Sequence, residues 1–151
     1  MNVLEFGSGR STMFFANRVK KVLSREHNEE WYNIVTKQIE TTTNITYEFY
    51  EDLGKYSDVS NIENNSLDIV VVDGRNRVNC LLNSVSKLKS GGILILDDSA
   101  RYLIYETDSP AKYIRKDRNP MWLEVEDILK ENFWRYKTTD GVSDTMILFK
   151  R

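Results

Sequence analysis

The segment Asn2-Val-Leu-Glu-Phe-Gly-Ser-Gly-Arg-Ser-Thr12 decides the fold. Residues 3–6 predict a short buried strand, which Gly7 and Gly9 end, and residues 11–19 predict a helix. A strand that passes through Gly-x-Gly into a helix lets the backbone approach a ligand closely and offers it free N–H groups. The pattern favours a nucleotide-like cofactor at the carboxyl end of a parallel sheet.

Two acids make this pattern more specific. Glu5 stands two residues before Gly7, where a dinucleotide-binding strand normally carries an apolar residue. Glu26 ends the next apolar strand, residues 21–25, at roughly the ~20-residue spacing that places a carboxylate on ribose hydroxyls. With these two acids, the chain resembles the class I S-adenosylmethionine-dependent methyltransferases. Their first motif has the form Glu-x-Gly-x-Gly, and their second strand ends in a ribose-binding acid.

A second match to this family lies in the middle of the chain. Residues 67–72 are nearly continuous apolar sequence, as expected for a central parallel strand, and end in Asp73-Gly-Arg75. Apolar residues from Val78 to Leu88 predict one face of a helix, and Lys89-Ser-Gly-Gly92 predicts its end. Residues 93–96 predict the next strand, which ends in Asp97-Asp98. The stretch Leu88 to Leu96 resembles the family's helix, Lys-x-Gly-Gly and strand.

The other segments continue the alternation of helix and strand. Asn28 predicts a helix cap, with Trp31, Ile34, Val35 and Ile39 as a packing face. Residues 45–50 predict a strand, and residues 51–66 leave a short helix undecided. Residues 99–120 favour a solvated loop, with a substrate lid as the alternative.

The end of the chain predicts a helix that begins at Asn119-Pro120, followed by an antiparallel hairpin. The hairpin strands are residues 133–136 and 146–149, on either side of Asp140-Gly141. The predicted fold is therefore α/β: a Rossmann-like, doubly wound, mostly parallel sheet with a C-terminal antiparallel hairpin.

Length and composition predict one soluble domain, residues 1–151. Apolar residues make up 40% and charged residues 29%, and the net charge of −2 disfavours nucleic acid as a partner. One cysteine, Cys80, fits a reducing compartment, and no apolar run is long enough to span a membrane. We expect a cytoplasmic protein. The family usually has one or two helices before the first strand, which this chain lacks, so we also expect a reduced form, a truncated form or a partner such as a second copy.

The resemblance implies S-adenosylmethionine as the cofactor. It implies that Glu5 supports the glycine loop and that Gly7 and Gly9 leave room for the ligand. It also implies that Glu26 accepts hydrogen bonds from both ribose hydroxyls. His27, the one histidine, favours a contact near the adenosine or a surface position over catalysis.

Asp73 is the best catalytic candidate, because it ends the central strand beside the glycine motif. In one hypothesis Asp73 contacts the cofactor or the methyl acceptor, while arginines such as Arg75, Arg77 and Arg101 hold an anionic acceptor. In another, Asp73, Asp97 and Asp98 bind Mg²⁺, as acids at these strand ends do in catechol-type O-methyltransferases. Our prediction includes no metal. A third interpretation makes these carboxylates simple partners of the arginines.

The sequence therefore predicts methyl transfer from S-adenosylmethionine to a small, polar or anionic acceptor. One alternative is a non-catalytic cofactor-binding or partner subunit with the same fold. A further alternative is an NAD-dependent oxidoreductase domain, which Glu5 disfavours, as does Thr12 in the place of a third glycine.

Overall fold

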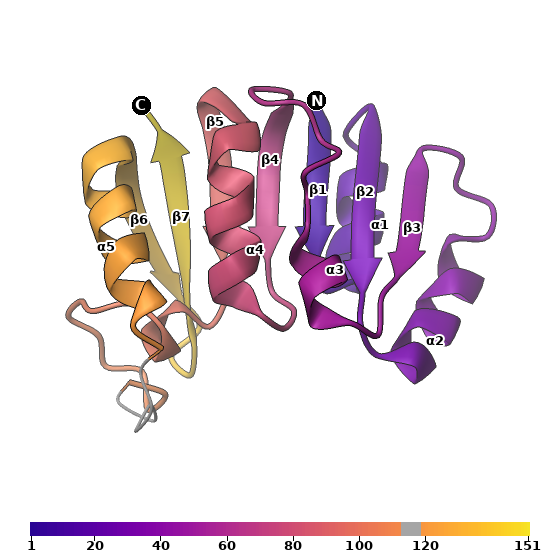
Figure 1. Ribbon diagram of the computed structural model, residues 1–151. Helices are drawn as coiled ribbons and strands as arrows, with labels where there is room; N and C mark the ends of the chain where they lie inside the picture. The colour runs from indigo at the N-terminus through magenta and orange to yellow at the C-terminus, as the bar shows by residue number, and fades with distance from the viewer. Residues whose placement is uncertain (113–118) are drawn as a thin grey trace.

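A computed structural model describes residues 1–112 and 119–151, and its centre is a seven-stranded sheet (Figure 1). The strands follow the order β3-β2-β1-β4-β5-β7-β6. Strands β1 to β5 run parallel, and β7 is antiparallel to both β5 and β6. The strand bounds are β1 Asn2–Phe6, β2 Lys21–Glu26, β3 Ile45–Phe49, β4 Leu67–Val72, β5 Leu88–Leu96, β6 Phe133–Thr139 and β7 Asp144–Lys150. The predicted fold class, including the C-terminal hairpin, is confirmed.

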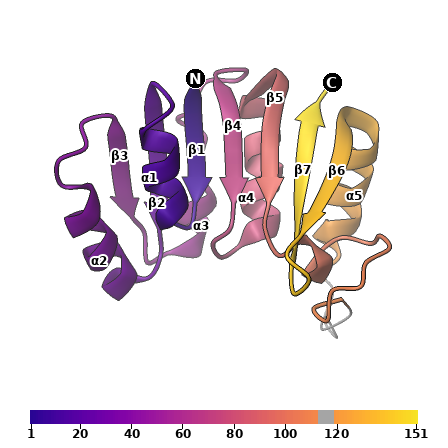
Figure 2. The same ribbon diagram turned by 180° about the vertical axis from the view of Figure 1, so that it is seen from behind.

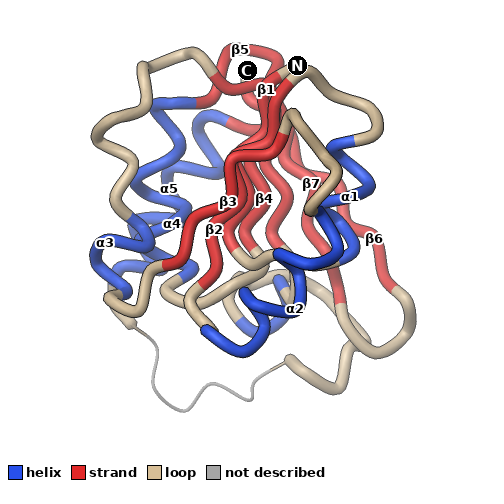
Figure 3. The backbone as a smooth tube through the Cα atoms, turned by 90° about the vertical axis from the view of Figure 1, so that its right-hand side faces the viewer, coloured by secondary structure: helices blue, strands red, loops and turns tan. Residues whose placement is uncertain are grey.

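Helices lie on both sides of this sheet, as Figure 3 shows edge-on. One side carries α3, α4 and α5, and the other carries α1. Their bounds are α1 Arg10–Ala16, α2 Glu29–Ile39, α3 Leu53–Ser57, α4 Arg77–Ser84 and α5 Met121–Asn132, with 3₁₀ turns at Val85–Lys87 and Ser99–Arg101. In the described residues, no helix combines the length and apolarity needed to cross a bilayer.

The larger core lies between the sheet and the layer of α3, α4 and α5. Alternate residues of the central strands point into it and are fully buried, among them Val70, Val72, Leu94 and Leu96. A smaller core lies under α1, around Val3, Phe15, Val22, Ile69 and Val71. The central strands are therefore apolar on both faces, which explains their nearly continuous apolar sequence.

The winding of the sheet reverses between β1 and β4, and two glycines meet there. Gly7 follows β1 with a φ of 94°, and Gly74 follows β4. A Cβ on Gly7 would lie 2.7 Å from the backbone nitrogen of Gly74, so the two loops approach as bare backbone. This reversal places an opening at the carboxyl ends of the strands, the usual ligand edge of such sheets.

The start of β5 differs from the prediction. Helix α4 ends at Ser84, and Lys89-Ser-Gly-Gly92 lies inside β5 instead of ending the helix. Leu88 is a buried strand residue, and the register with β4 shifts between Leu67 and Ile69. Gly91, with a φ of 75°, accommodates this irregularity, so Gly91 and Gly92 mark a bulge in β5.

Three smaller differences concern the connections. The undecided segment 51–66 contains a five-residue helix, α3, which Asp52 caps through the N–H of Lys55. Helix α5 begins at Met121, with Pro120 before its first turn. The lid interpretation of residues 99–120 includes residues 113–118, which lie outside the described residues.

Substituting Gly74 by Ala tests the close approach of the two loops. The new Cβ would lie 1.9 Å from the hydroxyl oxygen of Tyr56, which is fully buried. We expect the substitution to lower the free energy of unfolding by about 2–4 kcal/mol, as overpacking of a rigid site does. Urea denaturation measures this change.

The matched control is Gly9→Ala, since the nearest atom to that Cβ, on Trp31, is 3.9 Å away. Combining Gly74→Ala with Tyr56→Phe removes the clashing oxygen and should restore part of the lost stability. Equal stability of the Gly74 and Gly9 variants would contradict the close approach.

Candidate active site

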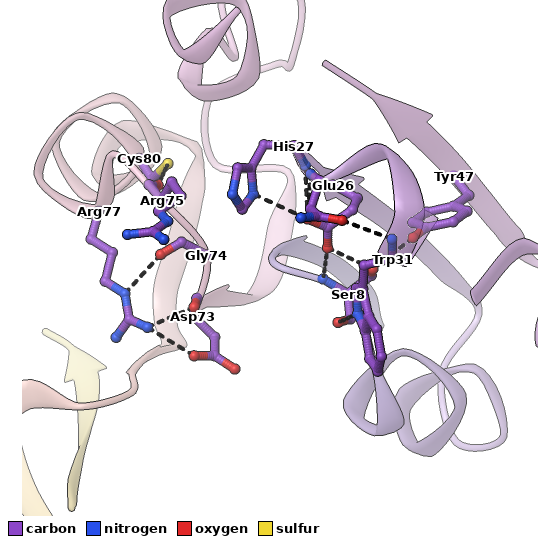
Figure 4. Close-up of polar contacts among 11 residues, drawn as sticks. Ser8, Glu26, His27, Trp31, Tyr47, Asp73, Gly74, Arg75, Arg77 and Cys80 are labelled. Atoms are coloured by element: carbon purple, nitrogen blue, oxygen red, sulfur yellow. Dashed lines mark hydrogen bonds and ion pairs between the residues drawn. The ribbon is translucent and has the colours of Figure 1, made fainter. Parts of the chain in front are cut away.

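A cleft of about 550 Å³ lies over the carboxyl ends of β1, β2 and β4 (Figure 4). Residues from all three strand ends and from α2 surround it. The lining includes Gly7, Ser8, Glu26, His27, Trp31, Ile34, Asp73 and Gly74. Four of the predicted cofactor residues, Gly7, Glu26, His27 and Asp73, thus come together at one opening.

Glu26 holds the glycine loop against the end of β2. One carboxylate oxygen accepts the backbone N–H of Ser8 at 3.1 Å and its hydroxyl at 2.8 Å. The other accepts the backbone N–H groups of His27 at 2.8 Å and Asn28 at 2.9 Å. These four bonds use about all the lone pairs that a carboxylate offers. The Ser8 hydroxyl lies 2.6 Å from the hydroxyl of Tyr47, so it can turn there and free an acceptor site on Glu26.

Trp31 and Ile34 line the cleft, whereas the sequence placed them on the packing face of their helix. Val35 and Ile39 do pack in the interior, but Trp31 and Ile34 are exposed. The indole N–H of Trp31 donates to the carbonyl of Ser8 at 2.8 Å and so lies against the glycine loop. Asn28 caps α2 as predicted, accepting the N–H of Trp31.

Glu5 and Gly9 do not line this cleft. Glu5 is fully buried beneath the loop and accepts the hydroxyls of Ser11, Thr12 and Ser24 at 2.5–2.6 Å. Burial raises the pKa of Glu5, and the three hydroxyl bonds oppose that rise. The backbone N–H of Gly9 donates to the hydroxyl of Thr12. Glu5 therefore braces the loop from within the fold.

A second cavity of about 530 Å³ adjoins the cleft and shares His27, Asp73 and Gly74 with it. Its walls come from the start of α4 and the chain after β5, and they include Arg75, Arg77, Asp98, Arg101, Tyr102 and Trp122. Arg75 is exposed and forms no ion pair with an acid in residues 1–112 or 119–151. Arg101 lies 3.5 Å from the carboxylate of Asp98 and is half exposed.

Arg77 pairs with Asp73, as the third interpretation of the sequence had it, and it also bonds backbone carbonyls. Its guanidinium donates to the carbonyls of Asp73, Gly74 and Asp97, and to the Asp73 carboxylate at 3.0 Å. Its side chain is largely buried. Arg77 therefore ties the ends of β4 and β5 together, and an anionic ligand would have to compete with these bonds.

Asp73 lies where the cavities meet. It lines the cleft, the polar cavity and a third, apolar cavity of about 340 Å³ beside α1. Partial burial and the nearby carboxylate of Asp97 raise the pKa of Asp73 to about 7, although Arg77 acts in the opposite direction. A carboxyl group with such a pKa can exchange a proton near neutral pH.

Each of the three acids of the magnesium hypothesis has another partner, although the carboxylate of Asp97 lies near that of Asp73. Asp97 accepts the hydroxyl of Thr145 at 2.6 Å, Asp98 faces Arg101, and Asp73 faces Arg77. Among the described residues, no set of three or more His, Cys, Asp or Glu side chains is close enough to hold a metal ion.

His27 lies between the two larger cavities. Its Nδ1 is 3.0 Å from a carboxylate oxygen of Glu26, and its ring contacts the edge of Tyr56 at 5.8 Å between centroids. These neighbours place it beside the acid that was expected to bind ribose.

Comparison with known proteins gives a result only at the level of structure. No protein-family model and no curated protein matches the chain. A provisionally named caffeoyl-CoA O-methyltransferase from Staphylococcus aureus matches 99% of this chain and 76% of its own, with a TM-score of 0.69 at 19% identity. A SAM-dependent methyltransferase from Aquifex aeolicus matches 99% and 81%, with a TM-score of 0.58 at 16% identity.

A third structure contains a ligand. The phosphoethanolamine N-methyltransferase 1 of Haemonchus contortus, in complex with phosphoethanolamine and S-adenosylhomocysteine, matches 99% of this chain and 38% of its own. Its TM-score is 0.61 at 17% identity. This chain has the class I methyltransferase fold. The resemblance inferred from the Glu-x-Gly-x-Gly motif is confirmed at that level.

Asp73→Asn tests how the site affects the stability of this methyltransferase fold. Because the pKa is raised to about 7 in the folded protein, the folded state binds more protons than the unfolded state between pH 4 and 7. The charge on Asp73 therefore lowers stability as the pH rises through this range. Half of the side chain is exposed, so solvent reduces the effect to about 1 kcal/mol.

We expect Asp73→Asn to raise the melting temperature by about 2–4 °C at pH 8 and to have no such effect at pH 4. Thermal unfolding followed by circular dichroism at both pH values measures the difference. A shift of the same size at pH 4 would argue against a raised pKa.

Glu26→Ala tests whether this acid supports the ligand-free fold. The substitution leaves three backbone N–H groups without their acceptor, so we expect a loss of about 1–3 kcal/mol in urea denaturation. The control is Glu29→Ala, because Glu29 is an exposed acid in the first turn of α2. This substitution should change the free energy of unfolding by less than about 0.5 kcal/mol. If both variants lost similar amounts of stability, the bonds of Glu26 would contribute no more to the fold than an exposed charge does.

Proposed function

We propose that this protein binds S-adenosylmethionine and transfers its methyl group to a small, polar or anionic acceptor. The observation that carries the proposal is the position of Asp73. It lies at the end of the central strand, on the boundary between the cleft and the arginine-lined cavity. Two neighbouring openings that share Asp73 suit a two-substrate transfer.

The cleft fits the cofactor in its chemistry. The bare backbone contact of Gly7 and Gly74 leaves its floor free of side chains, and Glu26 lies at the edge where ribose hydroxyls would bind. Trp31 and Ile34 offer apolar surface on the α2 side, which suits a flat purine. His27 would contact the adenosine side. Gly9 and Glu5 would not contact the cofactor directly. Gly9 would shape the glycine loop, and Glu5 would brace it from inside the fold.

When bound, the cofactor supplies a methyl group already activated by its sulfonium, so alignment of the acceptor matters more than covalent help. Asp73 would accept the proton that a hydroxyl or amine acceptor loses, since a pKa of about 7 suits a general base at neutral pH. Arg75 and Arg101 would bind the acceptor's negative charge from the walls of the polar cavity. Arg77 would hold the two strand ends in place.

Two other functions receive less support. An NAD-dependent oxidoreductase needs a close helix approach at the third glycine, and the buried Thr12 stands there with its hydroxyl on Glu5. A non-catalytic partner subunit would keep the cofactor cleft but would need no raised pKa at Asp73.

Calorimetric titration with S-adenosylhomocysteine, with NAD as the control ligand, tests the cofactor. We expect binding of the homocysteine compound and none of NAD. Glu26→Ala should weaken the binding by more than about tenfold, or about 1.4 kcal/mol, whereas Glu29→Ala should not. Unchanged affinity in the Glu26 variant would remove it from the site, and failure of the wild-type protein to bind would overturn the proposal.

A methyl-transfer screen with labelled cofactor and small carboxylates and phosphates that also carry a hydroxyl or an amine then tests the acceptor. Arg75→Ala should raise KM for an anionic acceptor with little change in kcat, since it contributes to binding alone. Asp73→Asn should lower kcat by about 10²–10⁴-fold and remove the rise in rate near pH 7. Transfer only to neutral acceptors, insensitive to Arg75, would leave methyl transfer standing and overturn the anionic class.

A further inference from the structure

On the α1 side, none of the helices in the described part of the chain lies over β5, β7 and β6 (Figure 2). Figure 2, which views the molecule from that side, shows β5, β7 and β6 in front, with α1 over β1 and β2. Six apolar side chains on this side form two rows across three strands, because paired residues on neighbouring strands point to the same face. We name this set the open sheet face; it consists of Ile93, Phe149 and Trp134 in one row and Ile95, Ile147 and Tyr136 in the other. Three of its residues, the isoleucines, are partly buried, and Ile93 and Ile95 pack against the core under α1.

The two faces of these strands differ sharply in burial. Toward α4 and α5, Leu94, Met146 and Leu148 are buried. On the open sheet face, Trp134 is 65% exposed, Tyr136 is 68% exposed, and Phe149 is exposed as well. The three aromatic side chains Trp134, Tyr136 and Phe149 therefore present apolar surface to solvent in the single chain.

The edge of the sheet has a different character from its face. On β6 the basic residues Arg135 and Lys137 alternate with the aromatic ones and point to the other side, where Arg135 bonds Glu126 of α5. Charged residues on an edge strand discourage the addition of another strand. The apolar rows therefore favour contact through the face of the sheet.

From these observations we propose that the open sheet face is the contact surface of a homodimer. Neither row carries a charged side chain, and Asp97, at the border of the face, accepts the hydroxyl of Thr145, so the apolar rows of two identical copies can pack together. The guanidinium of Arg151 lies over the Trp134 ring, 4.3 Å from its centre, and so covers one side of that ring at the border of the face.

The exposed aromatic side chains offer a large part of the area that a stable contact needs. An aromatic side chain carries about 150–250 Å² of surface, so Trp134, Tyr136, Phe149 and the nearby exposed Phe14 offer roughly 450 Å² per copy. Two copies would bury about 900 Å² through these side chains alone. Specific interfaces bury about 1,200–2,000 Å² in total, so the partly exposed isoleucines and the surrounding rim would have to supply at least about 300 Å² more.

The same contact would complete the candidate site, an extension that rests on the proposed function. The apolar cavity of about 340 Å³ beside Asp73 is lined by Phe14, Phe15, Val71 and Ile95, with Asp97 at its polar end. Ile95 belongs to the open sheet face. A second copy on that face would therefore wall the side of Asp73 opposite Arg75 and Arg101, and would keep water from it.

Sedimentation velocity over a range of concentrations tests the dimer. We expect a monomer–dimer equilibrium that high salt does not weaken, because the contact is apolar. Trp134→Glu combined with Tyr136→Glu should yield a monomer, and Trp134→Lys alone should weaken dimerisation at least about tenfold. Leu123→Glu, at an exposed apolar residue of α5 on the far side, is the matched control and should leave the dimer intact. A monomeric wild-type protein, or a double variant that still dimerises, would overturn the proposal.

Two further measurements separate this proposal from the proposed function. S-adenosylhomocysteine should bind the double variant as tightly as the wild-type protein, because the cleft lies over β1, β2 and α2. Methyl transfer by the double variant should fall in kcat/KM; an unchanged value would overturn completion of the site while leaving the interface in place. A dimer that binds no S-adenosylhomocysteine would instead overturn the proposed function and support the interface alone.

Discussion

The approach of Gly7 to Gly74 is the constraint on which the site depends. The loops after β1 and β4 can share the point where the winding reverses only because neither residue has a Cβ there. Side chains are excluded from the floor, so the functional groups stand around it: Glu26 and His27 after β2, and Asp73 after β4. Hydrogen bonds beneath the cleft fix this arrangement: Glu5 braces the glycine loop, and Arg77 ties the end of β4 to the end of β5.

Much of this could be predicted from the sequence, because the deciding signals are local. Residues 3–6 and 67–72 specify strands by continuous apolar sequence, and the acids at 5 and 26 identify the motif. Asn28 specifies its helix cap, and Asp140-Gly141 specifies the hairpin. Because parallel strands place their carboxyl ends at one edge of the sheet, the sequence alone predicts that Glu26 and Asp73 lie close together.

The remaining features depend on which surfaces the fold covers, and periodicity does not contain that information. Trp31 and Ile34 lie on the same helical stripe as Val35 and Ile39, but the sheet covers only the latter pair. Gly91-Gly92 marks a bulge in β5, although a Gly-Gly pair also commonly follows the end of a helix. The bonds of Arg77 to three carbonyls arise where two distant loops meet, so its sequence neighbours could not distinguish a structural role from ligand binding.

The junction at Asp73 also bears on how such a protein could change its substrate. One carboxylate adjoins a polar cavity on one side of the sheet and an apolar cavity on the other, and the cleft expected to hold the cofactor shares His27, Asp73 and Gly74 with the polar cavity. Substitutions in either side cavity alter the shape and polarity available to an acceptor without touching Gly7, Glu26 or Asp73. For the methyl transfer proposed above, acceptor selectivity could then diverge through mutations in the side cavities that leave Gly7, Glu26 and Asp73 in place.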